Sequence, residues 1–259
     1  MRYLALLILA VLVAGCTQKA ADGELIIKIT DVNPEKIFTG GKTIVTMDVE
    51  NNGNRTIRNV FIDFFETGFL MKGVCSKNIA ELSPGGYDTL SCELTAPFAI
   101  PSDKIINTVE ARARYQARLS MAKPITMVSR EEYDLQSKTG KLKLEPRTYS
   151  FKDDNIELQV EFSKELPLVE GRKEYAYFTV INIGSGFINS IRPNDMIIES
   201  NIISCPPRVA ISPIGKTFPR IACEIFVPEN INYLSEDMLI ININYNYEVR
   251  DKTDVEVIR

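Results

Sequence analysis

The chain has 259 residues, of which 30 are basic and 34 acidic, and its formal net charge is −4. This balance excludes the strongly basic surface typical of nucleic-acid-binding proteins, so we expect no nucleic-acid partner. Histidine and tryptophan are both absent. Without histidine the chain has no Ser-His-Asp or Cys-His catalysis and lacks the commonest zinc ligand, so we expect no metal site and no cofactor.

The first element in chain order is a short apolar run from Leu4 to Val13, preceded by Arg2 and followed by Ala14-Gly15-Cys16. It is too short to span a bilayer and has the layout of a secretory signal. The segment resembles the lipobox of lipoprotein signal peptides, which implies cleavage after residue 15 and a lipid on Cys16. The alternative is an ordinary signal site with a chance cysteine. The resemblance predicts a polar tether over 16–23 and a membrane partner. It also predicts an extracytoplasmic location at the outer face of the cytoplasmic membrane.

Strand signals dominate the rest of the chain. Residues 239–249 alternate strictly, with apolar side chains on odd positions, and 109–118 show the same period of two. Turn sequences such as Ser83-Pro84-Gly85-Gly86 separate the segments. The other expected strands are 25–31, 43–50, 57–65, 87–95, 122–130, 156–162, 174–181, 196–203, 219–226 and 253–258. Short strands with turns between them predict an all-β protein built from antiparallel β-sandwiches.

An internal repeat divides the chain. A shift of 131 residues places Val49 on Val180, Asn51 on Asn182 and Cys92 on Cys223 without a gap. With small loop deletions, Cys75 also meets Cys205. The repeat predicts a first sandwich over 24–130 and a second over 156–259. Residues 131–155 are expected to form a linker, partly extended, with short edge strands at 141–144 and 148–151.

Four cysteines remain after Cys16, and an even number outside the cytoplasm indicates disulfides. Because each repeat owns one pair at nearly equal spacing, the simplest pairing is Cys75–Cys92 and Cys205–Cys223. Each bond would close a loop of about 18 residues. Free buried cysteines or a zinc site are the alternatives. The signal peptide argues against the first, and the absence of histidine and of any Cys-x-x-Cys pair argues against the second.

The opening of the first repeat carries a family resemblance. Asn33-Pro34, Gly40-Gly41, the alternating run from Val45 to Asn51, and Gly53 together resemble CARDB-type domains. Those domains are Ig-like sandwiches similar to repeats in archaeal S-layer-related surface proteins. The resemblance implies two tandem Ig-like domains. It covers about 30 residues and is almost silent on function, because this sandwich hosts many binding and spacing roles.

Three surface features are candidate functional sites. Arg112, Arg114 and Arg118 form a basic stripe that could meet an acidic glycan or a carboxylate-rich partner, although such a stripe is more often a solvated sheet face. Asn54-Arg55-Thr56 is an N-glycosylation sequon. A third feature, an aromatic patch, is expected to be core rather than partner surface and comprises Phe61, Phe64, Phe65, Phe69 and Leu70.

Three functions are compatible with these observations. We expect a non-catalytic, lipid-anchored surface protein that presents two Ig-like domains to an envelope protein or glycan. The alternative is a lipoprotein accessory subunit of a membrane complex for transport or secretion. A remote alternative is a carboxylate-dependent hydrolase, for which Glu50, Asp63 and Glu66 lie near turns but lack any recognisable pairing.

Overall fold

The computed structural model describes residues 24–205 and 209–259. Its described part is nearly all β, which confirms the predicted all-β sandwich class. Cys16, the predicted lipidation site, lies outside the described residues. Within them, no helix combines the length and the apolar character that crossing a bilayer requires.

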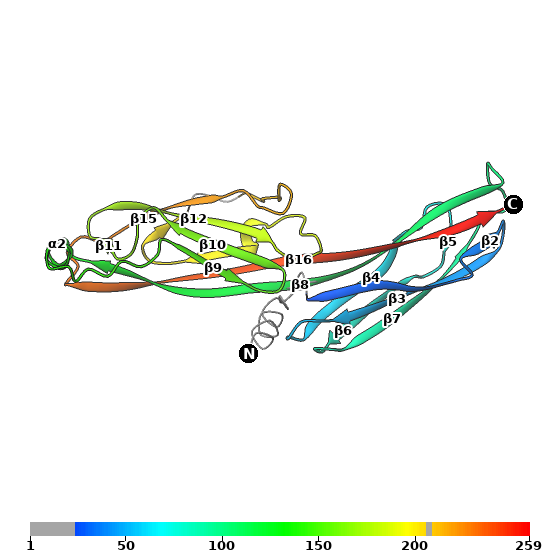
Figure 1. The fold of residues 1–259 in the computed structure, drawn as a ribbon, viewed down its shortest axis with the longest axis horizontal. Coiled ribbons are helices and arrows are strands. Elements are labelled where there is room, and N and C mark those ends of the chain that lie inside the picture. The colour runs from blue at the N-terminus through cyan, green and yellow to red at the C-terminus, as the bar shows by residue number, and fades with distance from the viewer. Residues whose placement is uncertain (1–23, 206–208) are drawn as a thin grey trace, which may run out of the picture.

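Two very long strands run through the whole molecule (Figure 1). β8 (Lys104–Val128) and β16 (Leu234–Ile258) pair antiparallel along their full length, from Val128 against Leu234 to Lys104 against Ile258. The sequence predicted two separate strands in each of these regions. They fuse because the intervening residues 119–121 and 250–252 contain neither glycine nor proline and so provide no turn. We call this pair the central ribbon.

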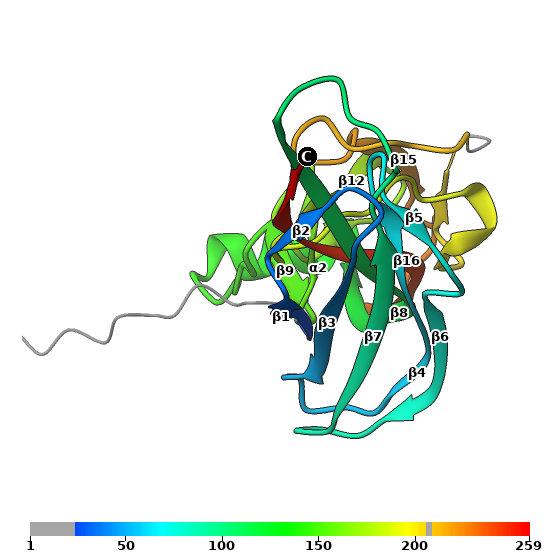
Figure 2. The ribbon, with the colours of Figure 1, turned by 90° about the vertical axis from the view of Figure 1, so that its right-hand side faces the viewer.

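Around the first half of the ribbon, two layers form a sandwich. One layer is a sheet in the order β1-β3-β7-β5, and the other is the ribbon extended by β4 and then β6. Figure 2 views this half end-on, with β2 beside the C-terminus. The bounds are β1 (Leu25–Asn33), β2 (Lys36–Phe38), β3 (Lys42–Asn51), β4 (Ile57–Glu66), β5 (Met71–Lys72), β6 (Ser76–Leu82) and β7 (Tyr87–Thr95).

The second half repeats this plan on the other end of the ribbon. A sheet in the order β14-β15-β12-β10-β9 lies on the opposite side of the ribbon from β3 and β7 in Figure 1, and β13 extends the ribbon itself. The bounds are β9 (Thr148–Lys152), β10 (Ile156–Phe162), β11 (Leu168–Val169), β12 (Lys173–Asn182), β13 (Met196–Glu199), β14 (Ile203–Ser204) and β15 (Ile221–Phe226), with a short 3₁₀ turn η1 (Pro193–Asp195).

The repeat is preserved in the pairing of strands. Val45 lies opposite Cys92 between β3 and β7, and the positions 131 residues later, Ala176 and Cys223, lie opposite each other between β12 and β15. Asn51 and its counterpart Asn182 both end a strand with a buried side-chain amide. Each accepts a hydrogen bond from the glycine two residues on.

The two copies exchange strands across the ribbon. β2 of the first copy pairs parallel with residues 256–258 of β16, and β11 of the second copy pairs parallel with Met127 and Val128 of β8. At mid-length Tyr115 lies opposite Tyr247, and Gln116 lies opposite Asn246. With the repeat shift of 131, Tyr115 corresponds to Asn246 and Gln116 corresponds to Tyr247. Each of these residues pairs with the neighbour of its own counterpart, so the copies are related by an approximate two-fold rotation through this point. The sheet pairing therefore crosses the predicted domain limits at residues 130 and 156.

One helix interrupts the predicted linker. α2 (Arg130–Lys138) begins at Ser129, whose hydroxyl accepts a hydrogen bond from the Glu132 backbone N–H at 3.2 Å. Acidic residues in its first turn and a lysine in its last turn favour the helix dipole. The helix was not predicted because it buries no side chain and so has no apolar period. The expected edge strand at 148–151 is present as β9, whereas 141–144 form no strand.

Both disulfides join the predicted partners. Cys75 stands where the chain passes from β5, in one layer, to β6, in the other, and its bond to Cys92 on β7 links the two layers. Cys205 follows β14 and bonds to Cys223 on the neighbouring strand β15. One bond therefore fastens two sheets together, whereas the other fastens two strands of one sheet.

Candidate functional site

The middle of the ribbon, which we call the waist, carries a buried polar cluster. Asn155, fully buried in the turn between β9 and β10, donates hydrogen bonds from Nδ2 to the hydroxyls of Tyr115 (2.9 Å) and Tyr245 (3.3 Å). Tyr245 donates to Asp153 Oδ2 at 2.7 Å. Asn155 Oδ1 accepts from the backbone N–H of Glu24 at 3.4 Å, so the start of the described chain is attached at the waist.

Burial controls the ionisation of this cluster. It raises the pKa of Tyr115, Tyr245 and Tyr247 above the ordinary tyrosine range, and the nearby carboxylates of Glu24 and Asp153 reinforce the shift for Tyr115 and Tyr245. Burial also raises the pKa of Glu24, with further repulsion from Asp154 and Asp153. The tyrosines therefore act as neutral hydrogen-bonding groups that hold the two halves together.

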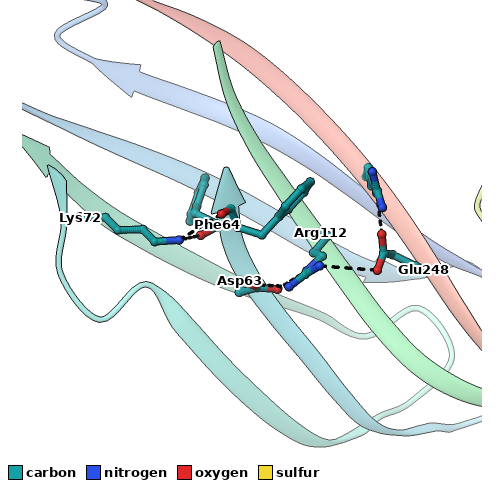
Figure 3. Close-up of polar contacts among 7 residues, drawn as sticks. Asp63, Phe64, Lys72, Arg112 and Glu248 are labelled. Carbon is teal, nitrogen blue, oxygen red and sulfur yellow. Dashed lines mark hydrogen bonds and ion pairs between the residues drawn. The ribbon is translucent and has the colours of Figure 1, made fainter. Parts of the chain in front are cut away.

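The outward face of the ribbon carries the predicted arginine stripe. Arg112 on β8 makes a two-pronged contact with Asp63 on β4, at 2.8 Å from Nε and 3.1 Å from Nη2, and lies 3.9 Å from Glu248 on β16 (Figure 3). The hydrogen bonds that Arg112 donates to the Asp63 carboxylate raise the pKa of Arg112. Because its guanidinium is occupied, Arg112 stabilises the junction of three strands rather than offering a free charge.

The same close-up shows how the aromatic patch is used. Lys72 donates a short hydrogen bond to the carbonyl of Phe64, whose ring is fully buried. Phe61 and Phe65 point to the outward face, where Arg114 stacks on Phe61 at 4.9 Å and Arg112 on Phe65 at 4.6 Å. The patch was expected to be core. Phe64 and Leu70 are core, Phe61 and Phe65 support arginines, and Phe69 is exposed.

Arg118, the third residue of the stripe, lies on the second half of β8. Its guanidinium donates to Asn242 Oδ1 on β16 at 2.7 Å. It lies four residues from Arg114 on the same strand, beyond the ribbon's midpoint. The structure therefore places the three stripe residues in three different environments, one paired with a carboxylate, one stacked on a ring and one bonded to an amide.

A cleft of about 740 Å³ opens at the waist beside Arg114. Its lining comes from both repeats: Phe61, Arg114 and Gln116 from the first, and Phe187, Arg192 and Asn246 from the second. A separate cleft of about 460 Å³, lined by Arg55, Arg118 and Asp154, adjoins Tyr115. Both clefts lie at the waist, and the larger of the two is the candidate binding site.

The sequence patterns did not single out Phe187 and Arg192, which line the cleft, or Arg250, which stacks on Phe187 beside it. Phe187 reaches the cleft through a backbone pairing with Glu248, at 2.7 and 3.0 Å. Arg250 stacks between Phe65 and Phe187, at 5.1 and 5.2 Å, and contacts Glu248 at 2.5 Å. Arg192 enters from the turn before η1. Strict alternation along β16 places residue 250 on the polar face, but only the pairing of β16 with β8, and of β8 with β4, brings Arg250 within reach of Phe65.

The remaining sequence candidates lie apart from the cleft. Asn54 is exposed in the turn after β3, as a glycosylation site requires. Asp63 is held by Arg112, Glu66 accepts the Gly68 backbone N–H at 2.9 Å, and Glu50 lies on β3 in the other layer. In the described ranges, no group of three or more histidine, cysteine or acidic side chains is arranged to hold a metal ion.

Comparison with known proteins gives little further information. No family model matches the chain, and no curated protein matches it. Among solved structures it is similar to a protein of unknown function from Porphyromonas gingivalis W83, with 10% identity, a TM-score of 0.26, and coverage of 79% of this chain and 84% of that one. It is also similar to red sea bream transglutaminase, with 14% identity and a TM-score of 0.24 over 91% of this chain and 31% of the enzyme. At these values neither likeness bears on the activity of this chain.

Proposed function

We propose that this chain is a non-catalytic, lipid-anchored protein of the cell envelope that holds a binding cleft on a rigid double sandwich. The observation that carries the proposal is the waist cleft, because residues of both repeats line it. The two disulfides indicate an oxidising, extracytoplasmic location and so agree with the predicted signal peptide. Lipidation of Cys16 is the part of the proposal that rests on the sequence alone.

The waist attachment of Glu24 has a consequence for how an anchored molecule would lie. Glu24 is eight residues beyond Cys16, and eight residues can span at most about 29 Å. A strand of 25 residues is roughly 80 Å long, so each end of the ribbon lies about 40 Å from the waist. The tether is shorter than this half-length. The rod would therefore lie along the membrane rather than stand on one end.

The proposal is tested by cross-linking mass spectrometry on native envelopes, with the full chain as bait and Cys16→Ser as the matched unanchored control. We expect membrane-fraction recovery and reproducible links for the wild type, and release of the control into the soluble fraction. Wild-type chain that appears only in the soluble fraction would overturn the anchor. Turnover of envelope polymers by the purified chain would overturn the non-catalytic assignment.

A second function, that of an accessory subunit of a membrane complex, is favoured by one observation. At the end of the first half, Phe38 and Phe98 are 64% and 86% exposed, and the ring of Phe98 lies over Gly40. Large exposed aromatic side chains are typical of protein interfaces. In the cross-linking experiment, links from this end to one membrane complex would select the accessory role over the independent binding role.

A further inference from the structure

The arginines around the waist differ in whether their charge is compensated. Arg112 and Arg250 share the carboxylates of Asp63 and Glu248. Arg114 is exposed and forms a stacking contact with Phe61 but no ion pair with any described carboxylate. Exposed Arg192, in the lining of the same cleft, donates its backbone N–H to Asp195 Oδ2 at 3.2 Å, but its guanidinium likewise forms no ion pair with a described carboxylate.

The cleft therefore carries an uncompensated positive charge. Glu248 is the one acidic residue in its lining, and this buried residue is already held by Arg250 and Arg112. A guanidinium that stacks on a ring is held in one orientation. Its N–H groups are therefore pre-organised to donate two parallel hydrogen bonds to a planar anion. The expected ligand group is a carboxylate.

The rest of the lining indicates what carries that carboxylate. Four side-chain amides, each with a donor and an acceptor, line the same cleft as the two arginines: Asn59, Gln116, Asn189 and Asn246. Amide groups of this kind match the paired donors and acceptors of neighbouring hydroxyl groups. Phe187, 51% exposed, adds an apolar surface against which the C–H face of a sugar ring can pack. A volume of about 740 Å³ accommodates a ligand of more than one ring.

We propose that the waist cleft binds an acidic saccharide of the uronic acid class. Its carboxylate lies between Arg114 and Arg192, and its hydroxyls contact the surrounding amides. This inference rests on the proposed envelope role and specifies the ligand of that binding site. The approximate two-fold rotation explains why one cleft serves two repeats, because the site forms only where the copies meet.

Isothermal titration of the full chain in detergent with a tetrauronate tests the proposal, with the uncharged tetrahexose as the comparison ligand. We expect saturable tetrauronate binding and none of the neutral sugar. Arg114→Gln and Arg192→Gln should each weaken binding about tenfold or more, since each removes a charge-assisted contact. The matched control is Arg220→Gln, which removes the same charge from an arginine that contacts Glu161 on the second sandwich.

A second variant tests the position without changing the charge. Asn189→Trp places a large side chain in the exposed lining of the cleft and should abolish binding, with thermal unfolding as the check that the fold is intact. The proposal is overturned by absence of tetrauronate binding, by equal binding of the neutral sugar, or by equal loss in Arg220→Gln. If envelope cross-links persist while tetrauronate does not bind, only the saccharide assignment fails. If tetrauronate binds but the chain has no envelope association, the envelope role fails and the assignment of the cleft as a saccharide-binding site is retained.

Discussion

Removal of the first disulfide distinguishes two independent sandwiches from one cooperative unit. The double variant Cys75→Ser/Cys92→Ser opens a loop with a sequence separation of 17 and leaves no free thiol in that pair. Loss of the loop constraint should lower the free energy of unfolding by about 3 kcal/mol in the chain-entropy model. Independent domains would confine this loss of stability to the first half, whereas the shared central ribbon predicts that both halves are destabilised.

The expected shift in melting temperature differs between the two cases. With about 2 cal/mol/K of unfolding entropy per residue, a chain of this size has roughly 0.5 kcal/mol/K, so a loss of 3 kcal/mol lowers Tm by about 6 °C. If only one half unfolded, the entropy would be about half as large and the shift about 12 °C, confined to one transition. Because the ribbon is the inner strand pair of both sandwiches, we expect the smaller, global shift.

Differential scanning calorimetry measures this directly, and hydrogen exchange along β8 and β16 locates the effect. The expected result is one transition at lower temperature, with faster global exchange at both ends of each long strand. The matched variant is Cys205→Ser/Cys223→Ser, which should give a comparable global shift. Two resolved transitions, with the second half melting at the wild-type temperature, would refute the cooperative-ribbon reasoning.

Two further substitutions test the polar groups that position the waist. Asn51→Ala should lower the free energy of unfolding by about 2–3 kcal/mol in urea titration, because the buried amide satisfies two carbonyls and one backbone N–H. The exposed control Asn52→Ala should change the free energy of unfolding by less than about 0.5 kcal/mol. Equal effects of the two substitutions would contradict this prediction. Burial and the neighbouring acids raise the pKa of Glu24 above its ordinary value of 4.5. Its contribution to stability is therefore present below about pH 4.5 and lost as pH rises through the folded-state pKa. Glu24→Gln should thus gain stability relative to wild type as pH rises from about 4 to 7, and a pH-independent difference would contradict the assignment.

Local patterns were sufficient for most strands and for the disulfides. β3, β7, β10 and β12 appear within one residue of their expected limits because strict alternation and flanking turn residues determine a strand locally. The cysteine pairs followed from the repeat, since Cys92 and Cys223 occupy equivalent strands and each repeat has one further cysteine. The short strands β2, β5 and β11 escaped prediction because two or three residues carry too little period to identify.

Local patterns could not determine how the repeats combine. The sequence by itself determined two copies of one sandwich plan, their cysteine pairs, their Asn-x-Gly strand ends and a polar face on each long strand. Only the tertiary structure decided that these long strands pair with each other along 25 residues, because antiparallel pairing between distant segments depends on register and not on local preference. That pairing exchanges β2 and β11 between the copies and attaches Glu24 at mid-length. It also opens, between Arg114 and Arg192, a cleft that neither repeat could form alone.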